Sequence, residues 1–448
     1  MAAIDHKYRY SYPSRIETDA NTSRLHLAAE LNGDRDVRFF EGDLLRPSIT
    51  ARNLRAISGI VGTRFYTPPS MVARLIRESD PVVTIARDQI RFEGFSACCS
   101  TYVRHDMSPY SYSVNHLSPG TTNVDFQADM RAALAKVRSD TSLRLMVDQE
   151  SVALQNDTST VVERKVPLPT RWIKGFTEVQ SHLRGMRKAI TLSKVQAQQF
   201  LRALPRAKAD HEQWLIKTAS GVRLSTRATQ NGVMIRGTQR LRALEALAVD
   251  ADHLQIWFNE QHRSSAWVLD YGDQRLLLVL NAEPWRGFSG DGQVLSQLVD
   301  IDQRVLAEVR AQLAWQAAID PLHIASVTRQ NTDTVAHALS VLAAQGLVGF
   351  DLVAEAYFHR ELPFDLSLIE RLNPRLKSAR ALLESGAVAI EQTPQGHAAD
   401  VHSSGVIHRV TVTQDGFTCT CPWYAKHQGE RGPCKHILAT QMRMDSAA

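Results

Sequence analysis

The sequence lacks any apolar stretch long enough to cross a membrane. Among its 448 residues, no run of 18 or more is apolar, whereas a membrane-spanning helix needs about 20. Residues 1–14 contain Lys7 and Arg9 but no apolar segment of the kind that a secretory signal peptide carries. Cysteine is scarce as well, with five in the chain, and this fits a reducing compartment. We therefore expect a cytoplasmic protein without membrane contact.

Sequence motifs of common catalytic sites are missing too. The chain has no G-x-x-x-x-G-K-[ST] phosphate-binding loop and no H-E-x-x-H metal motif. The segment 287–291 (Gly-Phe-Ser-Gly-Asp) approaches the G-x-S-x-G of serine hydrolases, but Asp291 stands where that motif needs its second glycine. A tight connection is the simpler interpretation of this stretch, and a loop that cradles an anion beside Arg286 is the alternative. No catalytic residue is predicted.

Two adjacent cysteines, Cys98 and Cys99, are the main chemical feature of the N-terminal region. Neighbouring cysteines rarely form a disulfide with each other because the short connection strains the bond. Burial in the core is the simpler interpretation, and a redox or nucleophilic role is the alternative. If the protein is an enzyme, its site is expected near Cys98, Cys99, Arg104 and Asp106.

Charge is distributed unevenly along the chain. The formal net charge is only +5, yet residues 161–242 contain 17 lysines and arginines against 4 acidic residues. Such a basic segment can follow a phosphate backbone or an acidic protein surface. Arg184, Arg187 and Lys188 are the predicted anion or nucleic-acid contacts within it. A distribution of these charges over several solvated faces is the alternative.

Metal chemistry is concentrated near the C-terminus. Cys419-Thr-Cys421 is followed by twelve residues and then by Cys434-Lys-His436. Three thiolates and one imidazole complete the tetrahedral shell of a zinc ion and leave no position for water or substrate. The pattern predicts one structural zinc ion held by these four side chains. Three unrelated surface thiols, or a disulfide that leaves one cysteine over, would be the alternative.

The residues around this motif predict a small folded unit. Apolar and polar residues alternate over 406–412, as in a strand, and an Asp-Gly pair at 415–416 is typical of a hairpin turn. We expect the second strand to carry both Cys419 and Cys421 on one side. The stretch from 434 onward favours a helix, which would bring His436 to the metal in its first turn.

The motif C-x-C-x12-C-x-H resembles the SWIM zinc finger. More widely, the chain is similar to a group of bacterial SWIM zinc-finger proteins of about this length, in the segments 92–99, 120–126, 167–172 and 286–290. This resemblance implies a zinc-dependent module for binding DNA or protein. It also implies accessory proteins that accompany AAA ATPases of the MoxR type and von Willebrand A-type proteins, which are therefore the expected partners.

A winged-helix-like unit is predicted before the finger. Helices are expected over 299–318, 322–327 and 332–345, followed by two wing strands at 347–350 and 355–359. Residues 319–365 contain two arginines against six acidic residues, and the second helix of the pair, 332–345, has no lysine or arginine. A helix that reads DNA normally carries cations. We therefore expect a protein-interaction or packing module.

Composition and length indicate a large folded protein. Hydrophobic residues make up 44% and charged residues 22% of the chain, as in ordinary globular proteins, and this length corresponds to about three domains. The predicted class is α+β and multidomain. Five regions are expected: a mixed N-terminal region at 1–161, a basic, β-rich middle region at 162–300, a winged-helix-like unit at 301–366, a linker or helical connection at 367–400 and a ββα zinc finger at 401–445.

The function predicted from the sequence is binding. We expect a zinc-binding SWIM-finger protein that acts as an adaptor for protein or nucleic-acid partners. Lys426, Arg431 and Lys435 are the predicted contacts of the finger itself. An uncharacterised enzyme with a site near Cys98, Cys99 and Asp106 is the alternative.

Overall fold

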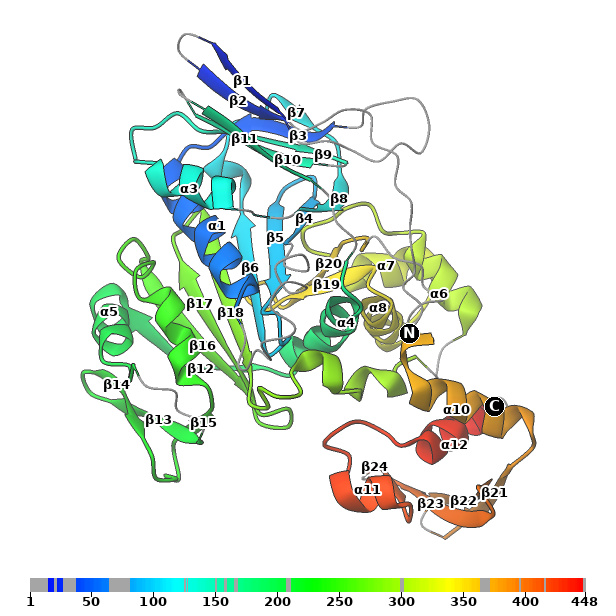
Figure 1. Cartoon of the computed structure of the whole chain (residues 1–448). Helices are drawn as coiled ribbons and strands as arrows, with labels where there is room; N and C mark the ends of the chain where they lie inside the picture. The colour runs from blue at the N-terminus through cyan, green and yellow to red at the C-terminus, as the bar shows by residue number, and fades with distance from the viewer. Residues whose placement is uncertain are drawn as a thin grey trace.

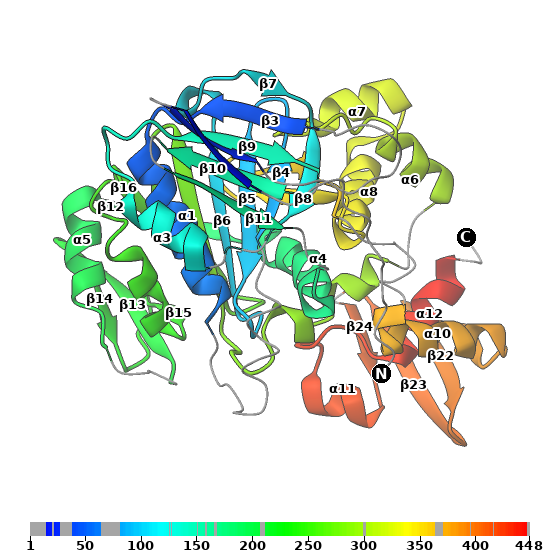
Figure 2. The same cartoon turned by 45° about the horizontal axis from the view of Figure 1, so that its top comes forward.

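The computed structural model describes residues 15–19, 22–26, 38–63, 81–124, 126, 128–149, 151–156, 159–164, 168–206, 211–298, 302–362, 371–394, 396–414 and 416–445. Helices and antiparallel sheets alternate along these ranges and form two hydrophobic cores. The predicted α+β, multidomain class is confirmed. Figures 1 and 2 show a large body and, next to the helix labelled α4, a smaller lobe made of the C-terminal elements.

An eight-stranded antiparallel sheet forms the centre of the body, in the order β12-β16-β17-β18-β6-β5-β4-β8. Its strands β5 and β6 are buried along their whole length, and β18 contains the continuous apolar run 276–280 that is typical of a strand covered on both faces. The strands are β4 (Val82–Ile85), β5 (Ile90–Phe95), β6 (Thr101–Met107), β8 (Gly120–Asn123), β12 (Arg187–Ser193), β16 (His253–Asn259), β17 (Ser264–Asp270) and β18 (Gln274–Asn281).

A second sheet, in the order β11-β10-β9-β3-β7, lies at the top of the body in Figure 1. Helix α1 (Pro47–Val61) packs against β5 and β6 and against α3 (Ala128–Lys136), so it joins the two sheets. The strands are β3 (Arg38–Asp43), β7 (His116–Leu117), β9 (Arg144–Asp148), β10 (Ser151–Asn156) and β11 (Ser159–Arg164), with a separate hairpin of β1 (Arg15–Asp19) and β2 (Thr22–His26) and a 3-10 turn, η2 (Pro109–Ser111).

Helix α4 (Thr170–Arg184) packs on strand β5 of the central sheet. It buries Trp172, Phe176 and Leu183 along one face, and Phe176 meets Phe95 of β5 in an edge-to-face contact with ring centroids 5.0 Å apart. Beyond α4 the chain forms α5 (Lys194–Arg202), a three-stranded sheet of β13 (Gln213–Thr218), β14 (Gly221–Ser225) and β15 (Val233–Ile235), and the 3-10 turns η3 (Thr238–Leu244), η4 (Phe288–Gly290) and η5 (Gln293–Ser296).

Three helices and a hairpin follow: α6 (Gln303–Arg310), α7 (Pro321–Thr328), α8 (Thr332–Ala344), β19 (Val348–Asp351) and β20 (Ala356–His359). The helix predicted over 299–318 is wrong at its end, because α6 stops at Arg310. Residues after α6 instead pair with β20: the Trp315 N–H donates to His359 Nδ1 at 2.8 Å, and the His359 N–H donates to the Gln316 carbonyl at 3.0 Å. This tertiary pairing competes successfully with local helix propensity.

The C-terminal lobe contains α10 (Pro374–Glu384), a four-stranded antiparallel sheet of β21 (Val388–Thr393), β22 (Gly396–Ser403), β23 (Val406–Thr413) and β24 (Gly416–Cys419), and the helices α11 (Pro422–His427) and α12 (Lys435–Asp445). Helix α12 packs on α10 and on the sheet. The strand predicted over 406–412 and the helix after 434 are both present. One core takes residues from the first three predicted regions and the other lies mainly in this lobe; the exact domain boundaries stay a prediction.

Among the residues that the structure describes, none of the helices combines the length and the apolar character needed to span a bilayer.

Candidate metal centre

The chain brings Cys419, Cys421, Cys434 and His436 together in the C-terminal lobe, and all four are buried. Cys419 is the last residue of β24 and Cys421 is the N-cap of α11. Cys434 lies directly before α12, and His436 is in the first turn of that helix. The prediction that one strand carries Cys419 and Cys421 is wrong, because the strand ends at Cys419 and Pro422 starts a helix directly after Cys421.

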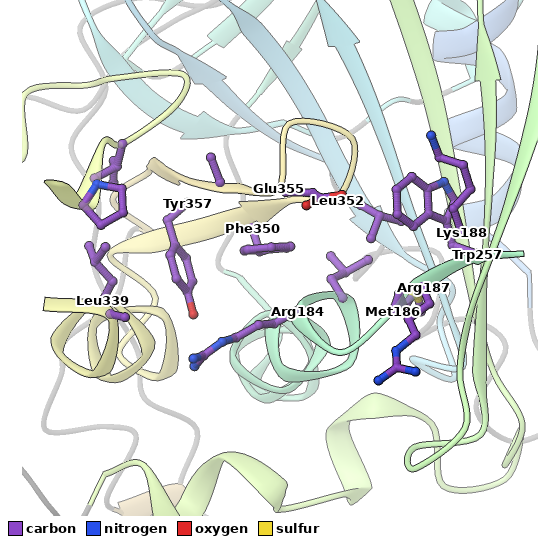
Figure 3. A pocket seen from close by; sticks show the side chains of 15 residues that line it. Arg184, Met186, Arg187, Lys188, Trp257, Leu339, Phe350, Leu352, Glu355 and Tyr357 are labelled. Carbon is purple, nitrogen blue, oxygen red and sulfur yellow. The ribbon is translucent and has the colours of Figure 1, made fainter. Parts of the chain in front are cut away.

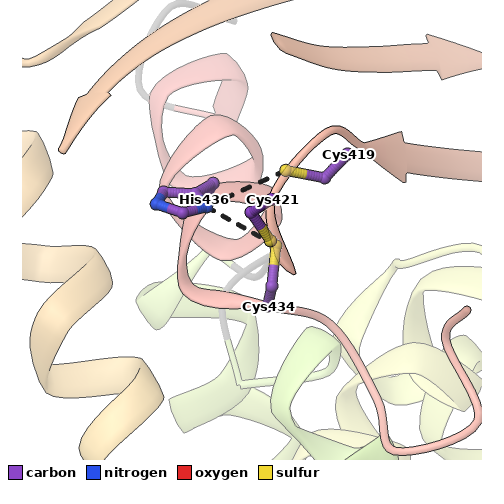
Figure 4. A group of neighbouring side chains, drawn as sticks. All are labelled: Cys419, Cys421, Cys434 and His436. Carbon is purple, nitrogen blue, oxygen red and sulfur yellow. Dashed lines mark hydrogen bonds between the residues drawn. The ribbon is translucent and has the colours of Figure 1, made fainter. Parts of the chain in front are cut away.

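The spacing of the donor atoms suits one zinc ion. All four lie within 4.8 Å of one another, and His436 Nδ1 is 3.8 Å from Cys419 Sγ and 4.0 Å from Cys434 Sγ (Figure 4). Zinc bonds of about 2.3 Å to sulfur and about 2.0 Å to nitrogen give tetrahedral edges of roughly 3.5 to 3.8 Å. The cavity between the donors therefore fits zinc after small adjustments.

Two helix starts contribute to the electrostatics of the cluster. The Tyr424 N–H at the start of α11 donates to Cys421 Sγ at 3.4 Å, and the Ile437 N–H at the start of α12 donates to Cys434 Sγ at 3.4 Å. Backbone donors and the positive end of a helix dipole both favour the thiolate over the thiol. Local folding thus prepares these two sulfurs as metal ligands.

The thiols influence one another strongly. The pKa of Cys434 is lowered to about 4, first by its hydrogen bond with the Cys419 thiol and then by His436 and the Ile437 N–H. The pKa of Cys419 is raised because it supplies the proton in that bond and because it is buried, and burial also raises the pKa of Cys421. Three thiolates so close together need a cation to offset their repulsion. A divalent ion that accepts soft ligands meets this requirement.

The imidazole of His436 is positioned by its neighbours. Its Nδ1 faces the sulfurs, as Figure 4 shows, and the His408 ring from β23 packs against it with centroids 4.3 Å apart. Its Nε2 is buried and has no hydrogen-bond partner among the described residues. Sequence reasoning missed His408, which reaches the cluster because β23 pairs with β24.

A buried set of three cysteines and one histidine on a ββα frame defines the C-terminal lobe as a zinc-binding finger, and the set is consistent with one zinc ion. Residues 408–440 match the family model of the SWIM zinc finger, so this part of the chain is a SWIM finger. Comparison with curated proteins found no match.

Among solved structures, the chain is similar over part of its length to two structures of Proliferating Cellular Nuclear Antigen proteins. Proliferating Cellular Nuclear Antigen from Entamoeba histolytica matches at 12% identity with a TM-score of 0.36, and the match covers 55% of this chain and 99% of that one. A PCNA2-PCNA3 complex from Sulfolobus tokodaii matches at 11% identity with a TM-score of 0.38, covering 54% and 100%. At these scores neither similarity bears on function.

The finger is fastened to the body by two loops, which we name the body loop (residues 287–293) and the finger loop (residues 428–433). Gln293 Nε2 donates to the carbonyl groups of Gly429 at 3.1 Å and Glu430 at 3.0 Å. Arg431 Nη2 donates in the other direction, to the Gly290 carbonyl at 3.4 Å. The glycine-rich stretch noted in the sequence is therefore a docking site for the finger.

Arg375 of α10 ties the two loops together. Its Nη1 donates to the carbonyl groups of Arg431 at 2.7 Å and Pro433 at 2.9 Å, and its Nη2 donates to the Asp291 carbonyl at 2.9 Å. Because Pro433 directly precedes Cys434, the contact between finger and body is one residue away from a metal ligand. Sequence reasoning gave no sign of this role, since the partners are backbone carbonyl groups.

The body loop is itself anchored by a buried polar network. The Asp291 carboxylate accepts hydrogen bonds from His182 Nε2 at 3.2 Å and Asn281 Nδ2 at 3.0 Å, and it faces Arg286. His182 Nδ1 lies 3.1 Å from the Ser264 hydroxyl. This order of groups resembles a serine hydrolase triad, but the Ser264 residue is only 1% exposed, so a substrate has no route to it. The role of this network is to fix the position of the body loop.

The predicted basic contacts fall into two places. Arg184, Arg187 and Lys188 are exposed and all three line a cavity of ≈ 710 Å³, which we name the basic groove, with Arg184 on the side of Tyr357 and the other two on the side of Trp257 (Figure 3). Arg431 lies in the finger loop, half-buried, with its guanidinium 4.8 Å from the centre of the Trp423 ring.

Lys426 is exposed on α11 and Lys435 is half-buried at the start of α12. Together with Arg431 these lysines belong to the finger, and none of the three lines the basic groove.

The basic groove combines an apolar floor with a cationic edge. Apolar side chains from α4, β16, α8 and the β19–β20 hairpin line it, including Trp257, Leu339 and Phe350. Lys188 Nζ lies 4.9 Å from the centre of the Trp257 ring, and Figure 3 shows Arg184 approaching Tyr357 from α4. Among the described residues that line it, Glu355 is the one acidic residue.

The residues of the alternative enzyme site are not brought together. Asp106 is buried near the end of β6, where it pairs with Arg91 at 3.2 Å and with Arg104 at 2.9 Å. Cys98 precedes the other end of that strand, with its Sγ 3.0 Å from the Ser100 hydroxyl, and Cys99 is buried. The structure separates the thiols from the carboxylate by the length of a strand.

Proposed function

We propose that this protein is a zinc-binding adaptor that recruits a protein partner, with a zinc ion that is purely structural. The observation that carries the proposal is the closed donor set of Cys419, Cys421, Cys434 and His436, each at most 7% exposed. Zinc held by four protein ligands has no open position at which to activate water or a substrate. Its contribution would be to fold the finger and to keep it docked on the body.

The basic groove is the surface that we propose for the partner. An apolar floor next to three exposed cations suits a protein segment that has acidic residues beside an apolar anchor, because the anchor is desolvated while the charges pair at the rim. The groove walls include α8, which contains no lysine or arginine, and Glu355. The apolar floor and the α8 wall therefore give a phosphate backbone no cation to bind beyond the rim, and this favours a protein segment with an apolar anchor over nucleic acid.

The winged-helix-like unit supports the same proposal as a packing and interaction module. Its hairpin is held to the body by buried ion pairs, with Asp351 3.1 Å from Arg91 and Glu93 2.6 Å from Arg360. One side of the hairpin thus packs on the central sheet while residues such as Tyr357 line the basic groove. The cysteine content predicts a cytoplasmic setting for this role.

The candidate partners are those that the family resemblance implies, an AAA ATPase of the MoxR type and a von Willebrand A-type protein. Binding of each to the zinc-loaded chain is measured by calorimetry, and an Arg184→Glu, Lys188→Glu variant should bind at least about tenfold more weakly. Lys194→Glu removes an exposed cation on α5, outside the groove lining, and should leave the affinity within about twofold.

Binding of nucleic acid, in place of a protein partner, is the alternative that a second experiment tests. Gel shifts with duplex DNA at increasing salt should show no specific complex. Tight binding whose logarithm falls steeply with the logarithm of salt concentration would instead indicate phosphate contacts and would overturn the proposal of a protein partner.

A further inference from the structure

A second cavity lies where the finger meets the body. Its volume is ≈ 280 Å³, and its walls come from α4, the body loop, the start of α10 and the finger. The side chains that matter for its chemistry are Lys174, Glu178, Asp291, Arg375, Trp423 and Arg431. We name it the junction cavity. The finger and the body therefore both contribute residues to the junction cavity.

Three cations converge on the junction cavity: Lys174, Arg375 and Arg431. The guanidinium groups of Arg375 and Arg431 lie 4.9 Å and 4.8 Å from the centre of the Trp423 ring, so the aromatic face offsets part of their charge. Among the described residues, Lys174 Nζ makes neither an ion pair nor a hydrogen bond. Cations gathered in a partly closed space repel one another unless an anion is present.

The two carboxyl groups in the lining do not neutralise this charge. The Asp291 carboxylate is directed to His182, Asn281 and Arg286. Glu178 accepts the backbone N–H of Gln293 at 3.1 Å, and its pKa is raised to about 8 by burial and by the nearby Asp291. At neutral pH Glu178 is therefore mainly uncharged, and the cavity keeps an excess of positive charge.

The pKa values of two of these cations reflect the same excess of positive charge. The pKa of Lys174 is lowered by burial and then by Arg375, and the pKa of Arg431 is lowered by burial and then by Arg286. Both shifts mean that the charged form is less favourable here than in water. A bound anion would reverse this penalty.

We propose that the junction cavity binds a phosphate group, either as free phosphate or as the terminal group of a small phosphorylated molecule. A phosphate offers several acceptor oxygens and negative charge to a lining that contains three cationic donors. The volume lies just below the range of about 300 to 1,000 Å³ that holds whole drug-sized ligands, so the remainder of a larger molecule would lie outside. The first residues of α10 also line the cavity, and the positive end of that helix favours an anion.

This site is independent of the partner proposed for the basic groove. Because its walls come from both the finger and the body, a bound phosphate would stabilise their docking, and undocking would weaken phosphate binding to the same degree. The site thus couples the concentration of a phosphorylated ligand to the position of the finger.

The experiment is calorimetric titration of the zinc-loaded full chain with inorganic phosphate, in chloride buffer at constant ionic strength, and in a second arm with ADP. One saturable site per chain is expected. Lys174→Gln should weaken binding at least about tenfold. Lys377→Gln, which removes an exposed lysine of α10 outside the lining, should change the affinity less than about twofold. Tighter binding of ADP than of phosphate would identify a nucleotide, and equal binding would identify free phosphate.

Three results would overturn the proposal. They are the absence of saturable binding in both arms, a Lys174→Gln variant that binds like the parent, and an equal loss in Lys377→Gln. Zinc content and melting temperature without phosphate check that Lys174→Gln is folded. Arg431→Gln is a second variant that should also lose binding if Lys174→Gln does not fold.

Discussion

Gly432 of the finger loop lies against the carbonyl group of Gly292 in the body loop, so closely that a Cβ at position 432 would overlap the carbonyl oxygen. Gly432 also has a φ of +72°, which favours glycine. Glycine at position 432 is therefore required for the backbones of finger and body to touch. The contact is two residues from the metal ligand Cys434.

Substitution of Gly432 by alanine should separate the finger from the body. We expect Gly432→Ala to lower the free energy of unfolding by about 1 to 2 kcal/mol for the positive φ and by a further 1 to 3 kcal/mol, roughly, for the overlap. Gly429→Ala is the matched control, because Gly429 has a φ of +84° and open space around its Cβ. Urea unfolding measures both, and equal losses would contradict the docking contact.

Zinc should be stoichiometric and essential to the finger. Metal analysis should give one zinc per chain in the wild type and in Cys98→Ser, and almost none in Cys434→Ser. Structural zinc contributes roughly 10 to 16 kcal/mol in finger peptides at neutral pH, so chelation should unfold the lobe. The body has its own hydrophobic core and should stay resistant to proteolysis. Full zinc retention in Cys434→Ser would contradict the assignment.

Glu178 should make the protein less stable as pH rises. Its pKa is raised from the ordinary 4.5 to about 8 in the folded chain, first by burial and then by Asp291. Between these values the folded state holds a proton that the unfolded state has released, so stability is complete below pH 4.5 and falls by up to about 1.4 kcal/mol per pH unit.

The test is a comparison of Glu178→Gln with the wild type at pH 6, 7 and 8, with zinc held at saturation. The uncharged glutamine removes this titration, so the variant should gain stability relative to the wild type at each step. Parallel pH profiles from urea unfolding would show that Glu178 does not titrate as argued.

The buried ion pair between Glu93 and Arg360 should be costly to break. Both side chains are fully buried and the atoms Oε1 and Nη1 are 2.6 Å apart. Glu93→Gln leaves the guanidinium without its countercharge, and we expect a loss of about 3 to 5 kcal/mol. Arg304→Gln, which breaks an exposed pair with Glu308 on α6, should cost less than about 1 kcal/mol. Similar thermal shifts in both variants would argue against the buried pair.

The metal centre could be predicted from the sequence because its information is local. All four donors fall within the segment 419–436, and the residue types alone indicate zinc. The strand β23 and helix α12 followed from alternation and propensity. The prediction of a strand at Cys421 was wrong, because Pro422 starts a helix directly after it and the cysteine spacing does not reveal that helix.

The central sheet depends on contacts that sequence patterns do not specify. Strand β6 pairs with β18 through partners such as Met107 and Gln274, which are far apart in the chain. Charge counting misled for the same reason: Arg360 was counted as a charge of an acidic unit, yet it is buried against Glu93. Pairing partners, and hence burial, are decided by the tertiary fold.

The hydrogen bonds from Arg375 to the Arg431 and Pro433 carbonyl groups have a consequence for the metal. In an excised finger, the twelve residues between Cys421 and Cys434 would lose chain entropy when zinc binds, because the ion closes this loop. In the whole protein, the body already restrains the end of that loop. The body thus acts as a template for the metal centre, so the full chain should hold zinc more tightly and release it more slowly than the excised finger.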